Sequence, residues 1–188
     1  MNLEITVNAL QLILISIIAY MVINNRNNSR IVKRQLPLQD RGMPRGSIFP
    51  RAQLTTVTGD TVEIIRSDNP TITIFTSSGC PVCKTLYPII EYNKAKYLNK
   101  INFVSLIVSS EQSLLEFIRA NNVSTPVAHI HPYPGSLEEF NTKTFPFAYF
   151  LSSSGVILTK GAVLNEDLFS LLISEGLSMI TMERKNAG

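Results

Sequence analysis

The chain has 188 residues, of which 45% are hydrophobic and 16% are charged, with two cysteines, no tryptophan and a formal charge of +3. This composition excludes an intrinsically disordered protein, and two cysteines are too few for a small secreted scaffold held by several disulfides. The positive charge lies mainly between Asn24 and Arg51, whereas the chain from Ala52 onward has ten basic and twelve acidic residues, which argues against a folded domain that binds nucleic acid through a basic face.

The N-terminal residues are the main source of the mean hydropathy of +0.15. Leu3–Ile23 is mostly apolar and spans 21 residues, which as a helix can cross about 30 Å of hydrocarbon. The start has no basic residue and no small-residue cleavage site follows, which disfavours a cleaved signal peptide. We therefore expect a transmembrane anchor at 1–23, a basic, proline-interrupted tether at 24–46 whose cations suit anionic lipid head groups, and one folded domain at 47–188.

Turn residues and hydrophobic periodicity predict the elements of this domain. They indicate, in chain order, a hairpin at Gln53–Thr58 and Thr61–Ile65, a buried strand at Thr71–Thr76, a helix from Pro81 to about Asn99, a strand at Ile101–Val108, a helix at Glu111–Asn121, an irregular segment around His129–Asn141, strands at Ala148–Leu151 and Val156–Lys160, and a helix at Asn165–Ser178. In the last helix we expect Asn165 as N-cap and core contacts from Leu164, Leu168, Leu171, Leu172 and Ile173. The order predicts an α/β domain with a mixed central sheet, helices on both faces and an N-terminal hairpin extension.

Cys80 and Cys83 form a Cys-x-x-Cys motif between a buried strand and a helix. At a helix N-terminus, unpaired backbone N–H groups and the positive end of the helix dipole favour a thiolate, so we expect a lowered pKa and a nucleophilic role for Cys80. Cys83, one turn further, can attack a mixed disulfide formed on Cys80. Because Pro81 has no N–H, the nearest donors are those of Val82 and Cys83, and we expect only a mild lowering.

Thr144-Phe145-Pro146 precedes the predicted strand at Ala148. Proline cannot sit in the middle of a sheet, so Pro146 belongs to a turn or a strand start. If its peptide bond is cis, the backbone of Phe145 can face Cys80 and pair with an extended substrate. We expect Phe145 and Pro146, together with Pro81 and Val82 between the cysteines, to contact the substrate.

The segments TIFTSSGCPVCKTLYP and TKTFPFAYFLSSSGVILTKGAV, together with the apolar N-terminus, resemble membrane-tethered proteins of the thioredoxin fold. Within that group, CPVCK followed by LYP, and TKGAVLNEDLFSLL, most resemble the MauD type, the accessory protein of methylamine dehydrogenase maturation. The resemblance spans Arg45–Ser178. It implies a thioredoxin-like fold, a cis bond before Pro146, and an activity on disulfides of an extracytoplasmic client protein. For the MauD type, the implied client is a disulfide-dense subunit of an amine dehydrogenase.

Three positions depart from the pattern of related proteins. Gly79 replaces the tryptophan that usually precedes the first cysteine, Ile74 replaces the buried acid of thioredoxins, and Leu86 replaces the glutamate that related tethered reductases carry. Without these carboxylates the group that deprotonates Cys83 is not identified. Reductase, oxidase and isomerase roles therefore all stay open.

Other interpretations of the cysteine pair lead to different functions. Together with His129 and His131 it could form a Cys₂His₂ zinc site. Ser77 fits the hydroxyl position of a peroxidatic-cysteine motif, although Thr73 stands where that motif has proline. The pair could also be an inert bridge in a non-enzymatic scaffold of the same fold. No phosphate-binding loop or other cofactor motif is visible, so we expect no cofactor and no metal.

Two arguments about membrane orientation conflict. The basic flank Arg26–Arg34 follows the anchor, and the positive-inside rule places such a flank in the cytoplasm. The resemblance implies the periplasmic side. Disulfide exchange is needed there, because thiols in the cytosol are kept reduced. We expect a single-pass membrane protein with an extracytoplasmic domain, the cytoplasmic orientation being the alternative. Its expected partners are a protein with cysteines or disulfides, an unidentified redox partner and the membrane, but no nucleic acid.

Overall fold

The computed structural model describes residues 11, 13–21, 36–56 and 58–186. The chain divides into two compact units, residues 1–34 and 35–188, and each is described by itself. In the first unit, residues 11 and 13–21 are helical and their side chains are exposed. Among the described residues, no helix has both the length and the apolar character needed to span a membrane. The remainder of the expected anchor, and residues 24–35 of the expected tether, lie outside the described residues.

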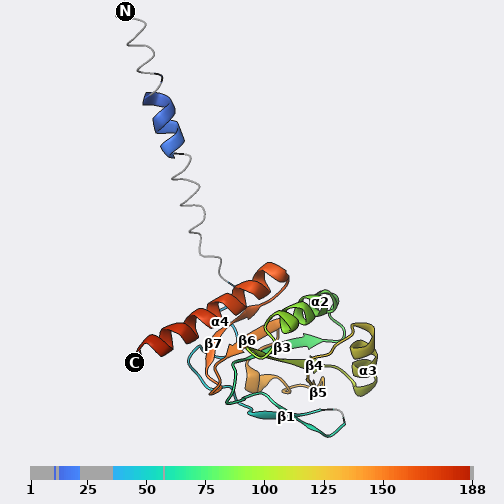
Figure 1. Cartoon of the computed structure of the whole chain (residues 1–188). Helices are drawn as coiled ribbons and strands as arrows, with labels where there is room; N and C mark the ends of the chain where they lie inside the picture. Colours follow the sequence, from blue (N-terminus) through green and yellow to red (C-terminus); the bar gives the residue numbers. More distant parts are fainter. Residues whose placement is uncertain (1–10, 12, 22–35, 57, 187–188) are drawn as a thin grey trace, which may run out of the picture. The chain divides into compact units, whose positions relative to one another are not determined.

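A five-stranded mixed sheet organises the second unit, with the strand order β5-β4-β3-β6-β7 (Figure 1). The central strand β3 pairs in parallel with β4 and antiparallel with β6, while β4 pairs in parallel with β5 and β6 antiparallel with β7. The β-branched and aromatic residues of the central strands suit a sheet that is covered on both faces. The strands are β3 (Thr71–Ser77), β4 (Asn102–Val108), β5 (Val127–Ile130), β6 (Phe147–Leu151) and β7 (Ile157–Ala162).

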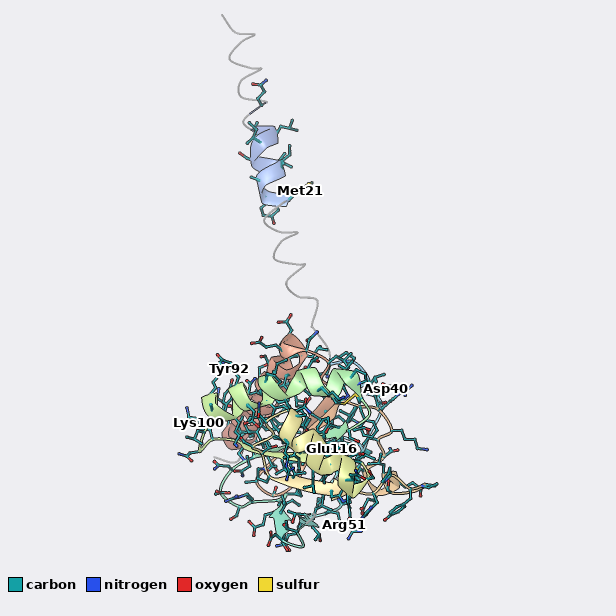
Figure 2. The ribbon with its side chains drawn as sticks, turned by 90° about the vertical axis from the view of Figure 1, so that its right-hand side faces the viewer. Met21, Asp40, Arg51, Tyr92, Lys100 and Glu116 are labelled. Atoms are coloured by element: carbon teal, nitrogen blue, oxygen red, sulfur yellow. A yellow bond between two sulfur atoms is a disulfide. The ribbon has the colours of Figure 1, made fainter. Side chains whose placement is uncertain are left out.

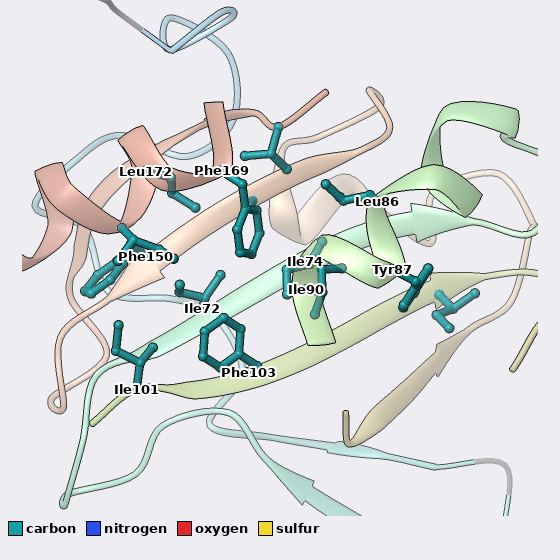
Figure 3. Packing of buried hydrophobic residues seen from close by; sticks show 14 of the residues in the cluster. Ile72, Ile74, Leu86, Tyr87, Ile90, Ile101, Phe103, Phe150, Phe169 and Leu172 are labelled. Atoms are coloured by element: carbon teal, nitrogen blue, oxygen red, sulfur yellow. The ribbon is translucent and has the colours of Figure 1, made fainter. Parts of the chain in front are cut away.

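The three long helices all cover one face of this sheet. They are α2 (Pro81–Lys96), α3 (Glu111–Ala120) and α4 (Glu166–Asn186), and their buried residues join one cluster with Ile72, Phe103 and Phe150 of the strands (Figure 3). The expectation of helices on both faces is therefore wrong. The steps from β3 to β4 and from β4 to β5 run in the same direction across the sheet, so right-handed crossovers place α2 and α3 on the same side.

The opposite face of the sheet carries a second cluster, which includes Phe75, Phe147 and Tyr149. Its cover consists of the residues that precede the sheet, among them Phe49, together with Val62 of the hairpin and Phe140. The hairpin forms a separate two-stranded sheet of β1 (Gln53–Thr55) and β2 (Thr61–Glu63), and Phe140 ends the 3₁₀ helix η1 (Glu138–Phe140).

Residues 36–48, here called the strap, run along the outer edge of β7. Ala162 N donates to Pro37 O at 2.9 Å, Gly46 N donates to Ile157 O at 2.9 Å, and Ile157 N donates to Ser47 O at 2.9 Å. Leu36 is 2% exposed and belongs to the helix-side cluster. The part of the expected tether from 36 to 46 thus packs within the compact unit.

Most of the predicted elements are confirmed, with changed boundaries. The hairpin strands are shorter than expected, and the last helix ends at Asn186 instead of Ser178. Asn165 caps that helix as expected, because its Oδ1 accepts a hydrogen bond from Leu168 N at 3.0 Å. Two expectations are wrong: Leu164 is 45% exposed instead of buried, and part of the expected irregular segment forms β5.

Candidate active site

The cysteine pair lies where β3 ends and α2 begins. Ser77-Ser78-Gly79 turns the chain, with Cys80 N donating to Ser77 O at 3.0 Å. Cys80 has extended backbone angles and is the N-cap of α2, and Pro81 occupies the first turn, where its missing N–H costs no helical hydrogen bond. The predicted helix start is confirmed.

The two sulfurs are paired as a disulfide, with Cα atoms 5.3 Å apart. Cys83 is fully buried, whereas Cys80 is half-buried and Pro81 and Val82 are exposed. Cys80 is therefore the sulfur that another molecule can reach. In the reduced state, Cys83 lies one helical turn away, where its sulfur can return to Cys80.

The surroundings of Cys80 favour a negative charge on its sulfur. Cys83 N donates a hydrogen bond to Cys80 Sγ at 3.2 Å, and the helix dipole adds its positive end. The first turn of α2 contains no acidic residue, and Lys84 follows directly after Cys83. A thiolate formed here has a backbone donor and no opposing carboxylate in its own helical turn.

The second predicted segment meets Cys80 from β6. The Phe145–Pro146 bond is cis, and the carbonyl oxygen of Phe145 lies 3.9 Å from Cys80 Sγ. Phe145 is half-buried and Pro146 is buried, with Pro146 O accepting a hydrogen bond from Val163 N at 3.3 Å. Leu164, the residue after Val163, is exposed. Its apolar side chain next to a predicted N-cap suggests a core position in the sequence, and its exposure becomes visible only in the folded chain.

The helix side of the sheet carries no carboxylate at the two positions where related proteins have one. Ile74 and Leu86 are both buried and apolar. Instead, the hydroxyl groups of Thr76 and Tyr87 form a buried hydrogen bond of 2.9 Å, and burial raises the pKa of Tyr87 to about 12. The sequence gives no local signal for this pair, because its members come together only when α2 packs on β3.

The two histidines belong to the edge of the sheet, His129 in β5 and His131 directly after it. His129 belongs to β5 rather than to a loop, and its Nε2 lies 2.8 Å from Ser109 O. The ring centroids of His129 and His131 lie 4.4 Å apart, with the rings tilted by 56°. The part of the chain that the structure describes contains no group of three or more His, Cys, Asp or Glu residues able to hold a metal. The structure therefore does not gather the two cysteines and the two histidines into a Cys₂His₂ site.

The sheet order, the Cys80–Cys83 pair at the start of α2 and the facing Phe145–Pro146 loop define a thioredoxin-like fold with a disulfide-forming Cys-x-x-Cys pair. In sequence, the chain is similar to the methylamine utilization protein MauD of Paracoccus versutus, with 26% identity over 149 residues, which cover 78% of this chain and 74% of that protein. No protein-family model matches the chain.

Solved structures agree on the fold. A protein from Chlorobium tepidum described as a thiol:disulfide interchange protein DsbE has a TM-score of 0.62 and 18% identity, over 71% of this chain and 99% of that one. The thioredoxin domain of a thiol-disulfide oxidoreductase from Bacteroides vulgatus also has a TM-score of 0.62, with 15% identity over 70% of this chain and 97% of that one. At these identities the likeness concerns the fold.

Proposed function

We propose that the protein exchanges disulfides with a protein client, with Cys80 as the attacking or attacked sulfur and Cys83 as the resolving one. The observation that carries this proposal is the division of exposure within the pair: Cys80 is accessible at the helix N-cap, and Cys83 is fully buried one turn below. Phe145 contributes backbone next to the reacting sulfur, and the exposed Pro81 and Val82 complete the contact surface.

The reaction balances within two thiol–disulfide exchanges. In the reducing direction, the Cys80 thiolate attacks a client disulfide, forms a mixed disulfide and releases one client thiolate. The Cys83 thiolate then attacks Cys80 Sγ, which closes the Cys80–Cys83 bond and releases the second client thiolate. Two electrons pass to the client. The same steps in reverse oxidise a client dithiol.

A trapping experiment tests the roles of the two cysteines. In Cys83→Ser, a client captured on Cys80 cannot be released, so mixed disulfides should accumulate, be sensitive to a reductant and map to Cys80 by mass spectrometry. Cys80→Ser is the matched control and should capture nothing. Absence of adducts on Cys83→Ser, or equal capture through Cys83 in the control, would contradict the proposal. A Cys80→Ser strain that keeps its phenotype would show a non-enzymatic scaffold instead.

The reduction potential of the Cys80–Cys83 pair decides the direction of electron flow. A value of about −270 mV indicates a reductase, and one of about −120 mV an oxidant. Equilibration with glutathione or dithiothreitol buffers, followed by alkylation of the free thiols, measures it directly.

We further propose that residues 1–23 anchor the protein in a membrane, that the domain lies on the extracytoplasmic side, and that the client is a subunit of an amine dehydrogenase under maturation. The apolar run Leu3–Ile23 and the similarity to a methylamine utilization protein support this, whereas the basic residues of 26–34 favour the reverse orientation. Alkaline phosphatase fused after Gly188 should be active, and the same fusion without residues 1–23 should not. Activity only of a cytosolic reporter would refute the orientation.

A further inference from the structure

A cavity of about 530 Å³ lies between α2 and α3, beside the cysteine motif. Ser78, Gly79 and Lys84 line it on the side of the motif, and Ser113, Glu116 and Ala120 of α3 line the other side. Figure 2 faces these two helices and labels Glu116 on α3. The function proposed above does not use this cavity.

Gly79 is not required by the backbone or by the packing of the chain itself. Its φ lies outside the left-handed region that favours glycine, and a Cβ built there would meet only Ser77 Oγ, at 4.0 Å. By contrast, Gly42 and Gly155 have φ values of +75° and +83°. A side chain at position 79 would therefore enter open space next to Cys80. Because Gly79 has no side chain, this space remains open as part of the cavity.

The cavity and the Phe145 loop flank Cys80 from two sides. In the sheet, β3 has β6 as one neighbour and β4 as the other; Phe145 precedes β6, and α3 follows β4. A polypeptide captured on Cys80 beside Phe145 therefore has the cavity on its other side. An extended chain advances about 3.3 Å per residue, so a side chain one to three residues from the captured cysteine comes within reach of it.

The charges at the cavity suit a neutral side chain with a polar end. Lys84 and Glu116 are both exposed and of opposite sign, and neither forms an ion pair among the described residues. The lining combines hydroxyl and charged groups with the apolar Ala120 and part of Phe117. An aromatic ring with a hydroxyl meets both kinds of surface and leaves no additional buried charge.

We propose that this cavity is a specificity site that receives a tyrosine-like side chain of the client, close to the cysteine that reacts with Cys80. The proposal rests on the disulfide exchange proposed above. It predicts that the protein prefers polypeptides with such a neighbour over small thiols and over featureless segments.

The test uses short glycine-rich peptides whose single cysteine is linked to thionitrobenzoate. Attack by the Cys80 thiolate on the peptide sulfur forms the mixed disulfide and releases coloured thionitrobenzoate, so that one disulfide forms for each one broken. Six peptides place tyrosine at each position within three residues of the cysteine, and a seventh has none. For the reduced wild-type protein, at least one tyrosine peptide should react about tenfold faster than the tyrosine-free one, since burying part of the ring contributes about 1.4 kcal/mol.

Two variants fill the cavity from opposite sides, Gly79→Trp and Ala120→Trp. In each, the ratio of rates between the preferred peptide and the tyrosine-free peptide should fall to about one. Ser153→Trp, at an exposed turn elsewhere, should keep the wild-type ratio. Position 79 adjoins Cys80, so Gly79→Trp can slow the reaction of every peptide, including the tyrosine-free one. In that case the result for Ala120→Trp is the decisive one.

Two outcomes overturn the site while leaving disulfide exchange intact: no tyrosine position exceeds the tyrosine-free peptide, or the preference survives in both cavity variants. Failure of the proposed function looks different. In that case wild-type protein does not react with any peptide or with the small disulfide 5,5′-dithiobis(2-nitrobenzoate), and the site fails with it.

Discussion

The hydroxyl of Tyr149 joins three parts of the second unit, and Tyr149→Phe measures what that junction contributes. The side chain is fully buried in the cluster on the face opposite the helices. Its hydroxyl accepts a hydrogen bond from Met43 N of the strap at 3.0 Å and donates one to Phe140 O of η1 at 2.6 Å. Phenylalanine keeps the ring contacts with Phe75 and Phe147 and removes only these two bonds.

The expected loss of unfolding free energy is about 2–4 kcal/mol, because each bond contributes about 1 kcal/mol and a buried group left without its partner costs up to about 3 kcal/mol. The loss depends on pH. Burial raises the pKa of Tyr149 from 10.0 to about 12, so its contribution is complete below pH 10 and is lost as the pH rises toward 12, because the unfolded chain ionises first. At pH 11 the difference between the two proteins should be about 1.4 kcal/mol smaller than at pH 8.

Urea denaturation of the oxidised proteins at pH 8 and pH 11 measures both quantities. Tyr92→Phe is the matched control, because Tyr92 is 60% exposed and its hydroxyl should contribute less than about 0.5 kcal/mol. Disulfide exchange by the folded Tyr149→Phe protein should stay at the wild-type rate, since the hydroxyl lies across the sheet from α2. A loss below about 0.5 kcal/mol at pH 8, or a difference that does not change with pH, would refute the reasoning.

Three further variants test the charges and hydroxyls described above. Lys84→Glu places an anion in the turn after Cys83 and should slow alkylation of Cys80 in the reduced protein at pH 7 by about three- to tenfold. The control Lys96→Glu, at the far end of α2, should keep the wild-type rate. Equal alkylation rates for Lys84→Glu and the wild type would exclude a role for this charge. Burial lowers the pKa of Lys160, so the folded protein loses this proton before the unfolded chain does. Wild-type stability should therefore rise as the pH approaches the ordinary lysine pKa of 10.5 from below, and denaturation curves of Lys160→Met should lack this rise. Tyr87→Phe removes the buried hydrogen bond to Thr76 and should cost about 1–2 kcal/mol in thermal or urea unfolding; a neutral result would show that the bond contributes no net stability.

The sequence predicts the reactive half of the domain well because its signals are local. A β-branched run, the Ser-Ser-Gly turn and Pro81 place a strand, a turn and a helix start within a dozen residues, and the structure has β3 and α2 at those positions. The cis bond before Pro146 has no such local signal. The family resemblance implies this cis bond, and the structure contains it.

The errors concern residues whose environment is set by distant parts of the chain. Basic composition indicates a tether up to residue 46, but Leu36 is buried and the strap pairs with β7. The last helix continues beyond Ser178 to Asn186. Gly176 lies within this helix against the ring of Phe150, where a Cβ would collide. The four residues of β5 are too few for periodicity to separate a strand from a loop.

The pairing of the strap with β7 has a consequence for the association of the protein with other chains. An unpaired outer strand offers backbone groups on which a foreign strand can add, and proteins commonly block this route to aggregation. Here the strap covers the outer edge of the six-residue strand β7, through hydrogen bonds such as the one from Ala162 N to Pro37 O. A redox partner consequently cannot extend the sheet at β7 unless residues 36–48 first detach from it.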